Sequence, residues 1–134
     1  MARSLIKKIT LPKIEDDCFL SFGQYSDHIP FPIKRVYYIW DAKPGLLRGA
    51  HTHLKTKQII FCLRGKFRLV LDDGKSKNEI LMTVPNEGVY LAPLIWHEMH
   101  DLTKETIILV LASRKYEPKD YVREYRNFLK LVKR

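Results

Sequence analysis

The chain has 134 residues, of which 46% are hydrophobic, so it can bury the core of a folded domain and is not intrinsically disordered. Lysine and arginine total 24 against 15 aspartates and glutamates, which leaves a net charge of +9 and favours an anionic partner such as a phosphorylated metabolite. Because the basic residues are scattered, with no stripe of them alternating with stacking aromatic residues, we expect no nucleic acid partner.

The first residues of the chain carry no targeting signal. Residues 1–10 are basic but lack the apolar stretch of a signal peptide, and no apolar run in the chain approaches the roughly 20 residues of a membrane span. Cys18 and Cys62 fit no metal-binding or redox spacing. We therefore expect a reduced, cytoplasmic protein with no membrane partner.

Short segments rich in β-branched and aromatic residues follow one another from residue 33 to residue 113, and they predict β-strands. Turn residues separate them, such as Asp73-Gly74 and the sequence Asn86-Glu87-Gly88. No helical pattern interrupts the series, which favours an antiparallel sandwich or barrel. The segments are IKRVYYIW (33–40), KQIIFCLRG (57–65), KFRLVLDDG (66–74), EILMTV (79–84), GVYLAPLI (88–95) and ETIILVLAS (105–113).

The tail of the chain changes to a helical period. Apolar residues recur there with the spacing of a helix face, and Pro118 suits a first helical turn. We predict one amphipathic helix over about 118–133 that packs on the outside of the sheet. With no repeat and no linker in the sequence, the prediction is a single domain over 1–134, with N-terminal strands over about 1–30 and a barrel over about 31–114.

Two histidines, His51 and His53, stand one residue apart where a strand is expected, so both side chains point to the same face. The spacing Gly45, five residues, His51-x-His53, four residues, Gln58, six residues, Gly65 matches the first cupin motif position for position. Metal-binding cupins carry Glu where this chain has Gln58. The fold class that this match implies is all-β, a cupin or double-stranded β-helix jelly-roll barrel, here with a C-terminal α-helix.

The second cupin motif is also recognisable, in an altered form. Gly88, Pro93 and His97 keep its general shape, but the proline and histidine are closer together and Leu94 stands where a glycine is expected. A cupin metal site needs three imidazoles and a carboxylate, whereas Gln58 offers a neutral amide. We therefore expect no metal and no other cofactor. Neutral imidazoles in a cavity then suit proton transfer, because their usual pKa lies near the working pH; the alternative is that they are interior polar residues with a structural role.

The motifs together resemble the dTDP-4-keto-6-deoxyglucose 3,4-ketoisomerases of the cupin superfamily. The resemblance covers roughly residues 29–129, and RG-x-H-x-H with WHEMHD goes beyond a general cupin pattern. The matching segments are IPFPIKRVYYIWD, RGAHTH, Gln58, LDDG, PNEGVYLAPLIWHEMHD, LVLAS and DYVREYRNF.

The resemblance implies an isomerase that acts without metal on a dTDP-linked 4-keto-6-deoxy sugar and moves the ketone from C4 to C3 through an enediol or enediolate. The product would serve the synthesis of dTDP-3-amino-3,6-dideoxy sugars for surface glycans such as lipopolysaccharide, O-antigen or S-layer. It also implies a homodimer whose N-terminal strands are exchanged between subunits. The segment DDCFLSFGQ, from Asp16, departs from the Asp-x-Arg-Gly-x-Leu found in many relatives.

On the family pattern, the catalytic candidates are His51, His53 and Tyr37. His51 is the candidate base at C3 and His53 the second proton-transfer group, with their order left open. The phenol of Tyr37 would hydrogen-bond the sugar or relay a proton; the alternative is a tyrosine of the core or of an interface.

The substrate-binding candidates lie around these residues. Arg48 would hold the pyrophosphate or an enediolate oxygen, since a guanidinium pairs with phosphate through charge-assisted hydrogen bonds. Arg35 is the second candidate for the pyrophosphate; the alternative is a solvated strand arginine. Gln58 fits a neutral hydrogen-bonding role, and His97 would line the same cavity. Trp96 would pack the nucleotide or fill the barrel.

Three other functions are alternatives to this one. A cupin 3,5-epimerase of dTDP-sugars would also use a histidine base, but its motifs match less well. A metal-dependent cupin dioxygenase would need a better ligand set than Gln58 allows. A non-catalytic cupin that binds sugar nucleotides would bind the substrate without turning it over.

Overall fold

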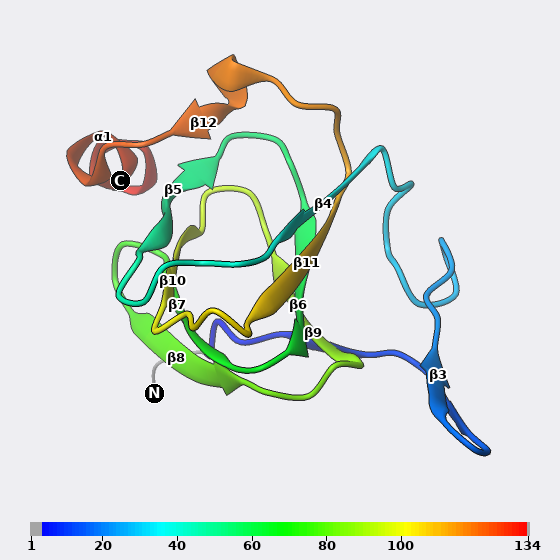
Figure 1. Cartoon of the computed structure of the whole chain (residues 1–134). Helices are drawn as coiled ribbons and strands as arrows, with labels where there is room; N and C mark the ends of the chain where they lie inside the picture. The colour runs from blue at the N-terminus through cyan, green and yellow to red at the C-terminus, as the bar shows by residue number, and fades with distance from the viewer. Residues whose placement is uncertain (1–3, 134) are drawn as a thin grey trace.

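Two five-stranded antiparallel sheets pack against each other to form a barrel in the computed structural model, which describes residues 4–133 (Figure 1). The first sheet has the strand order β1-β9-β6-β11-β4, the second β12-β5-β10-β7-β8, and β2 and β3 form a separate hairpin. The elements are β1 (Lys8–Thr10), β2 (Lys13–Glu15), β3 (Phe19–Ser21), β4 (Arg35–Ile39), β5 (Arg48–His53), β6 (Gln58–Arg64), β7 (Phe67–Asp72), β8 (Lys77–Met82), β9 (Glu87–Leu91), β10 (Trp96–His100), β11 (Ile107–Ala112), a 3-10 turn (Pro118–Asp120), β12 (Tyr121–Val122) and α1 (Tyr125–Val132). The jelly-roll barrel expected from the sequence is confirmed.

Strand β6 shows how the sequence determines the two faces of the first sheet. Its alternate residues Ile60 and Cys62 point into the core between the sheets. Ile59 and Phe61 point to the outer face, where the segment containing Ile29 covers them. A strand buried on both faces must be apolar along its whole length, which is why IIFCL is a continuous hydrophobic run.

The interior of the barrel changes from apolar to polar along its length. Most inward-facing side chains pack in one core cluster. Near the loop that joins β5 to β6, the inward positions instead carry polar groups, among them His53, Gln58 and His97, each less than 4% exposed. Buried polar groups cost free energy unless they are hydrogen-bonded, so this end of the barrel is built around a specific polar network.

The C-terminal segment differs from the single helix predicted over 118–133. Residues 118–120 form a 3-10 turn, Tyr121 and Val122 pair with β5, and the helix α1 begins only at Tyr125. Among the described residues, the edge of β5 has no other strand beside it at this point. The apolar residues 121 and 122 therefore pair with this edge as a strand instead of starting the helix. α1 then packs on the outside of the second sheet through Phe128, as expected. The eight-residue α1 is far too short to cross a membrane, and no other helix in the described part of the chain is long and apolar enough to do so.

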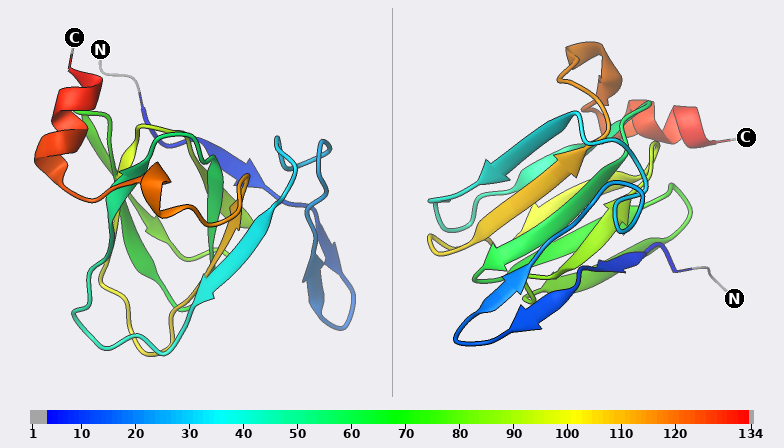
Figure 2. Two further views of the ribbon diagram at one scale, coloured as in Figure 1. Left: turned by 90° about the horizontal axis from the view of Figure 1, so that it is seen from above. Right: turned by 90° about the vertical axis from the view of Figure 1, so that its right-hand side faces the viewer.

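The N-terminal region also differs from its predicted boundaries. β1 pairs with β9 and so belongs to the barrel, whereas β2 and β3 form a hairpin that projects away from it (Figure 2). The hairpin exposes large apolar side chains: Ile14 is 53% exposed, Phe19 64% and Leu20 54%. An apolar groove separates the hairpin from the outer face of the first sheet, where Leu63 and Leu109 line it.

Candidate active site

Four strands bring the predicted histidines and their polar neighbours together inside the barrel. His51 and His53 come from β5, and His97 from β10, where it lies opposite His51 in the strand pairing. The ring centroids of His51 and His97 are 4.7 Å apart, and those of His51 and His53 are 5.1 Å apart. Gln58 from β6 and Tyr37 from β4 complete the group through hydrogen bonds to one another and to His53.

A local distortion of β5 directs the side chain of His51 toward His53 and His97. Gly49 and Ala50 both have positive φ, at 79° and 57°, and the pairing with β10 shifts register between His97 and Glu98. A bulge of this kind re-aims the side chains that follow it. Gly49 is needed here because a β-carbon at this position would lie 3.1 Å from the backbone oxygen of His97. The Arg-Gly pair before the histidines is therefore part of the site's architecture.

Both ring nitrogens of His53 are engaged by protein groups. Nδ1 lies 3.2 Å from Oδ2 of Asp120, and Nε2 lies 2.9 Å from Nε2 of Gln58. Gln58 in turn accepts a hydrogen bond at 2.9 Å from the hydroxyl of Tyr37. Sequence reasoning assigns Asp120 no role, although this residue begins the motif DYVREYRNF; no local signal separates it from Glu117 and Glu124, which also precede the tail helix.

His51 has one nitrogen engaged and one free among the described residues. Its Nδ1 lies 3.1 Å from the carbonyl oxygen of Gly49, which can only accept, so Nδ1 donates. The lone pair of the neutral ring is then at Nε2. The side chain is half-buried, so part of it remains accessible. These properties are those of a base held ready for a substrate proton.

The pKa values of all three histidines are shifted toward the neutral ring. Burial, together with the nearby His53, lowers the pKa of His51 to about 4. Burial also lowers the pKa of His53 against the opposing effect of Asp120, and it lowers the pKa of His97 well below its usual range. Burial raises the pKa of Tyr37 to about 12, so its phenol is protonated at neutral pH.

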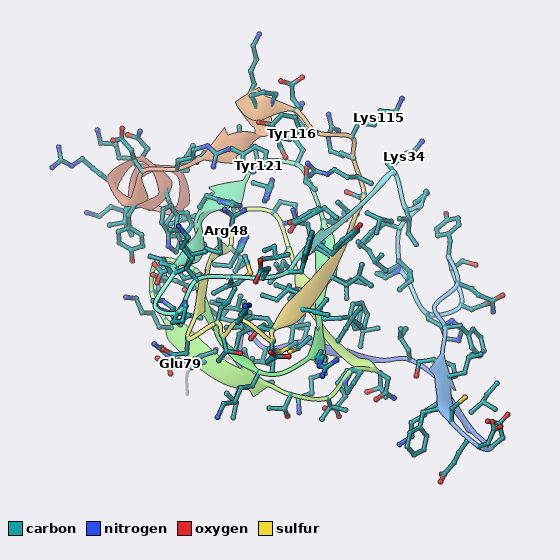
Figure 3. The ribbon with its side chains drawn as sticks, viewed as in Figure 1. Lys34, Arg48, Glu79, Lys115, Tyr116 and Tyr121 are labelled. Atoms are coloured by element: carbon teal, nitrogen blue, oxygen red, sulfur yellow. The ribbon has the colours of Figure 1, made fainter. Side chains whose placement is uncertain are left out.

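Arginine side chains and tyrosine rings lie next to this cluster. Arg35 donates to the hydroxyl of Tyr121 at 3.3 Å and its guanidinium lies 5.3 Å from the ring centre of Tyr37. Arg48 is exposed at the start of β5, and Arg123 lies 4.5 Å from the ring centre of Tyr121. Figure 3 shows Tyr121 beneath the C-terminal segment and Arg48 beside β5. In residues 4–133 none of these three arginines forms a salt bridge, so their charges remain available to an anion.

Trp96 does not join the cluster, and the prediction that it packs a nucleotide there is not supported. It precedes His97 on β10 and therefore points to the opposite face. Its ring packs against Tyr125 and Phe128 beneath α1, and its Nε1 donates to Glu98 at 2.9 Å. Five of the other seven predicted site residues, Tyr37, His51, His53, Gln58 and His97, are brought together, and Arg35 and Arg48 lie near them.

The three histidines also raise the question of a metal ion. One nitrogen from each of them lies within 4.8 Å of the others, which is close enough for a shared cation. His53, however, has both nitrogens engaged, and its Nε2 faces the amide of Gln58 where a carboxylate ligand would be needed. The arrangement therefore fits proton transfer better than metal coordination.

Comparison with known proteins gives the family. Residues 4–133 match the family model FdtA, described as WxcM-like, C-terminal. The chain belongs to this family. A protein of Aneurinibacillus thermoaerophilus named TDP-4-oxo-6-deoxy-alpha-D-glucose-3,4-oxoisomerase is 48% identical over 105 residues, which cover 78% of this chain and 76% of that protein. The resemblance to the 3,4-ketoisomerases is confirmed.

Solved structures of family relatives share the fold closely. QdtA, a sugar 3,4-ketoisomerase from Thermoanaerobacterium thermosaccharolyticum solved in complex with TDP, has a TM-score of 0.93 and 35% identity over 96% of this chain and 95% of its own. A histidine-to-asparagine variant of the same enzyme, solved with TDP-4-keto-6-deoxyglucose, has a TM-score of 0.94 and 34% identity over 98% of this chain and 96% of its own. The sugar epimerase NovW of Streptomyces spheroides is 19% identical, with a TM-score of 0.74 over 90% of this chain and 69% of its own, which shows a shared fold alone.

Proposed function

We propose that this protein is an isomerase that converts dTDP-4-keto-6-deoxyglucose to a dTDP-3-keto-6-deoxyhexose. The Aneurinibacillus protein and QdtA named above are a 3,4-oxoisomerase and a 3,4-ketoisomerase by name, and QdtA was solved with TDP and, as a variant, with TDP-4-keto-6-deoxyglucose. The observation that carries the proposal is the half-buried, neutral imidazole of His51, whose Nε2 has no partner among the described residues and which lies close to Arg48 and Arg123.

His51 is assigned as the base at C3. The hydrogen on C3 is acidic because the C4 carbonyl stabilises the carbanion as an enediolate. Nε2 of His51 takes this hydrogen as a proton and leaves an enediolate with its negative charge on the C4 oxygen. The proton of the C3 hydroxyl passes to the C4 oxygen, the protonated His51 returns its proton to C4, and the C3 oxygen becomes the ketone. Two hydrogens have moved from C3 and its oxygen to C4 and its oxygen, and no oxidant is needed.

The other polar groups have supporting roles in this proposal. Tyr37 contacts a sugar oxygen, and the buried His97 packs against the ring of His51. Arg48 and Arg35 hold the pyrophosphate, whose oxygens accept the forked donors of a guanidinium. Gln58 acts through His53 and Tyr37 instead of touching a metal.

We also propose that the protein is a homodimer formed through its N-terminal strands. The β2–β3 hairpin projects from the barrel with three large apolar side chains exposed, and an apolar groove lies beside it. Exposed contiguous apolar surface of this kind is unusual in a monomer. Exchange of the hairpin between two copies would bury both surfaces.

The test of the activity is proton NMR in D2O with chelator-treated protein and dTDP-4-keto-6-deoxyglucose. The expected result is deuterium at C3 or C4 together with the signals of a 3-keto product. His51→Asn serves as the matched variant and should bind the nucleotide without turnover. Exchange at C3 and C5 without movement of the ketone would instead identify an epimerase, and binding without any exchange would identify a sugar-nucleotide-binding cupin.

The product suggests the next reaction. A ketone at C3 is the group that an aminotransferase needs to install a 3-amino substituent. We therefore place the enzyme, within this proposal, before a transamination in the synthesis of a 3-amino-3,6-dideoxyhexose for a surface glycan.

A further inference from the structure

Asp120 is a buried carboxylate at the point where the C-terminal segment meets the barrel. It is 6% exposed and lies next to Tyr121, which pairs with His53 in the strand ladder. Its Oδ1 accepts a hydrogen bond from the backbone of Lys55 at 2.7 Å. Its Oδ2 accepts from the backbone and the hydroxyl of Thr56, and it contacts Nδ1 of His53. Although burial opposes ionisation, these hydrogen bonds hold the pKa of Asp120 below its usual range.

The negative charge on Asp120 fixes which group donates in each hydrogen bond from His53 through Gln58 to Tyr37. A carboxylate can only accept, so the Nδ1 of His53, 3.2 Å away, must carry the hydrogen. In the neutral ring Nε2 is then an acceptor, and the amide group 2.9 Å from it must present its NH2. The amide oxygen of Gln58 consequently faces Tyr37 and accepts its hydroxyl hydrogen at 2.9 Å.

We propose that Asp120 is a positioning residue that orients His53, Gln58 and Tyr37 as one directed hydrogen-bond chain. The chain leaves His51, and not His53, to accept the substrate proton, since the lone pair of His53 is already bound to Gln58. It also commits the hydrogen of Tyr37 to Gln58, so the phenol oxygen meets the substrate as an acceptor. The catalytic consequence of this inference rests on the proposed function, whereas the direction of the hydrogen bonds does not depend on it.

The consequence for the reaction lies at Tyr37. Hydrogen bonds in a chain polarise one another, and this chain ends on a negative charge. The phenol oxygen therefore becomes a better acceptor for a sugar hydroxyl, the group that must lose its proton when the new ketone forms. Tyr37 and His51 would approach the substrate from β4 and β5, two strands of opposite sheets.

An amide at position 120 cannot reproduce the arrangement. Both oxygens of Asp120 face a backbone N–H, from Lys55 and from Thr56. Asparagine would turn its own NH2 toward one of these donors or toward His53. Asp120→Asn is therefore expected to disturb both the anchoring of the segment and the tautomer of His53, and a second variant is needed to separate the two effects.

Thr56→Val is that second variant. The threonine hydroxyl donates to Asp120 but does not touch His53. The change loosens the anchor of Asp120 while leaving the carboxylate beside His53. It should lower the melting temperature, keep the His53 tautomer and keep kcat within about twofold of wild type.

The experiment is nitrogen-15 NMR of full-length protein labelled at histidine, with the His53 signals assigned by their loss in His53→Asn, combined with steady-state kinetics. In wild type, His53 should show a protonated Nδ1 and an unprotonated Nε2 at neutral pH. Asp120→Asn should shift this tautomer and lower kcat by about 10- to 100-fold, with KM changed less than about threefold.

Three results would overturn the inference. One is an Nε2-protonated or doubly protonated His53 in wild type. This result alone would contradict the proposed tautomer, even if Asp120→Asn fails to fold. Another is an Asp120→Asn protein with the wild-type tautomer and kcat. A third is a loss of kcat in Thr56→Val equal to that in Asp120→Asn, which would reduce Asp120 to an anchor. If wild type shows no turnover, the proposed function fails. The NMR result still tests the direction of the hydrogen bonds between Asp120 and Tyr37.

Discussion

The rings of His53 and His97 stack face to face, with 5.9 Å between their centres and only 6° between their planes. They come from different strands, β5 and β10, and both are less than 4% exposed. Two imidazolium ions could not share this space, because like charges in a buried site repel strongly. The packing itself therefore keeps the site neutral, and several measurable properties depend on that.

Activity should persist at a pH where an ordinary histidine base would be lost. His51 must be neutral to act, and its pKa lies at about 4 because of burial and the neighbouring His53. As pH falls, kcat/KM should therefore stay level through the usual histidine range and decline only toward pH 4. The measurement is a pH–rate profile of kcat/KM, restricted by circular dichroism to conditions where the protein is folded. An acidic limb near the ordinary histidine value of 6.5 would contradict the assignment.

Stability should fall in the same acidic interval. Each histidine has a lower pKa folded than unfolded, so below the unfolded value of 6.5 the unfolded chain binds more protons. The free energy of unfolding should therefore decrease as pH falls from about 6.5 toward 4, by up to about 1.4 kcal/mol per pH unit for each such histidine. Urea unfolding at several pH values measures this slope. His51→Asn should make the slope shallower; an unchanged slope would mean that His51 does not contribute.

Gly49→Ala should damage both stability and catalysis. The new methyl group would lie 3.1 Å from the His97 carbonyl oxygen and would push β5 away from β10, moving His51 from its position. Gly45 provides the control, since it has a similar positive φ of 81° but a methyl group added there would meet nothing within 4 Å. Gly45→Ala should cost about 1 kcal/mol from backbone strain alone and leave kcat intact, whereas Gly49→Ala should cost more and lower kcat. Equal effects on kcat would show that the close approach is unimportant.

The hairpin should control the oligomeric state. Phe19→Glu places a charge on a side chain that is 64% exposed and lines the groove, so it should shift a wild-type dimer toward monomer in sedimentation velocity. Leu81→Glu, on β8 of the other sheet and 59% exposed, is the matched control and should leave the dimer unchanged. A wild-type monomer at micromolar concentration would refute the proposed assembly.

Removal of metal should leave the reaction unaffected. His53 presents no free lone pair, and Gln58 presents a donor where a carboxylate would be needed. Protein dialysed against a chelator should keep its kcat and contain far less than one equivalent of zinc, nickel or iron by elemental analysis. Loss of activity on chelation that a divalent cation restores would require a different mechanism.

Much of the barrel could be predicted because the faces of its strands follow from the sequence pattern. The continuous apolar run IIFCL predicts a buried strand, and the period of two predicts that His51 and His53 share a face; the structure confirms both. Trp96 shows the limit of such reasoning. The choice between cavity and exterior depends on one position along β10, and a neighbouring residue takes the opposite face.

Contacts between distant parts of the chain could not be predicted. Asp120 and His53 are 67 positions apart, and nothing local marks them as partners. The late start of the tail helix has the same origin, because only the folded barrel reveals that β5 has an edge for residues 121 and 122 to join. Leu94 is a further case. It has a φ of 63° at the point where the cupin motif expects glycine, so the backbone kept its shape while the residue changed.

Asp120 follows the other residues of the site in the sequence, and this order matters while the protein is being synthesised. A ribosome makes His51, His53, Gln58 and Tyr37 well before it reaches residue 120, so the nascent chain passes through a stage in which the barrel strands exist but His53 has no carboxylate beside it. A product released early, without the segment that forms β12, would lack this contact as well as the cover over the edge of β5. The geometry thus ties the orientation of His53 to the synthesis of residues 120–122, and a chain that stops before them is expected to lose activity.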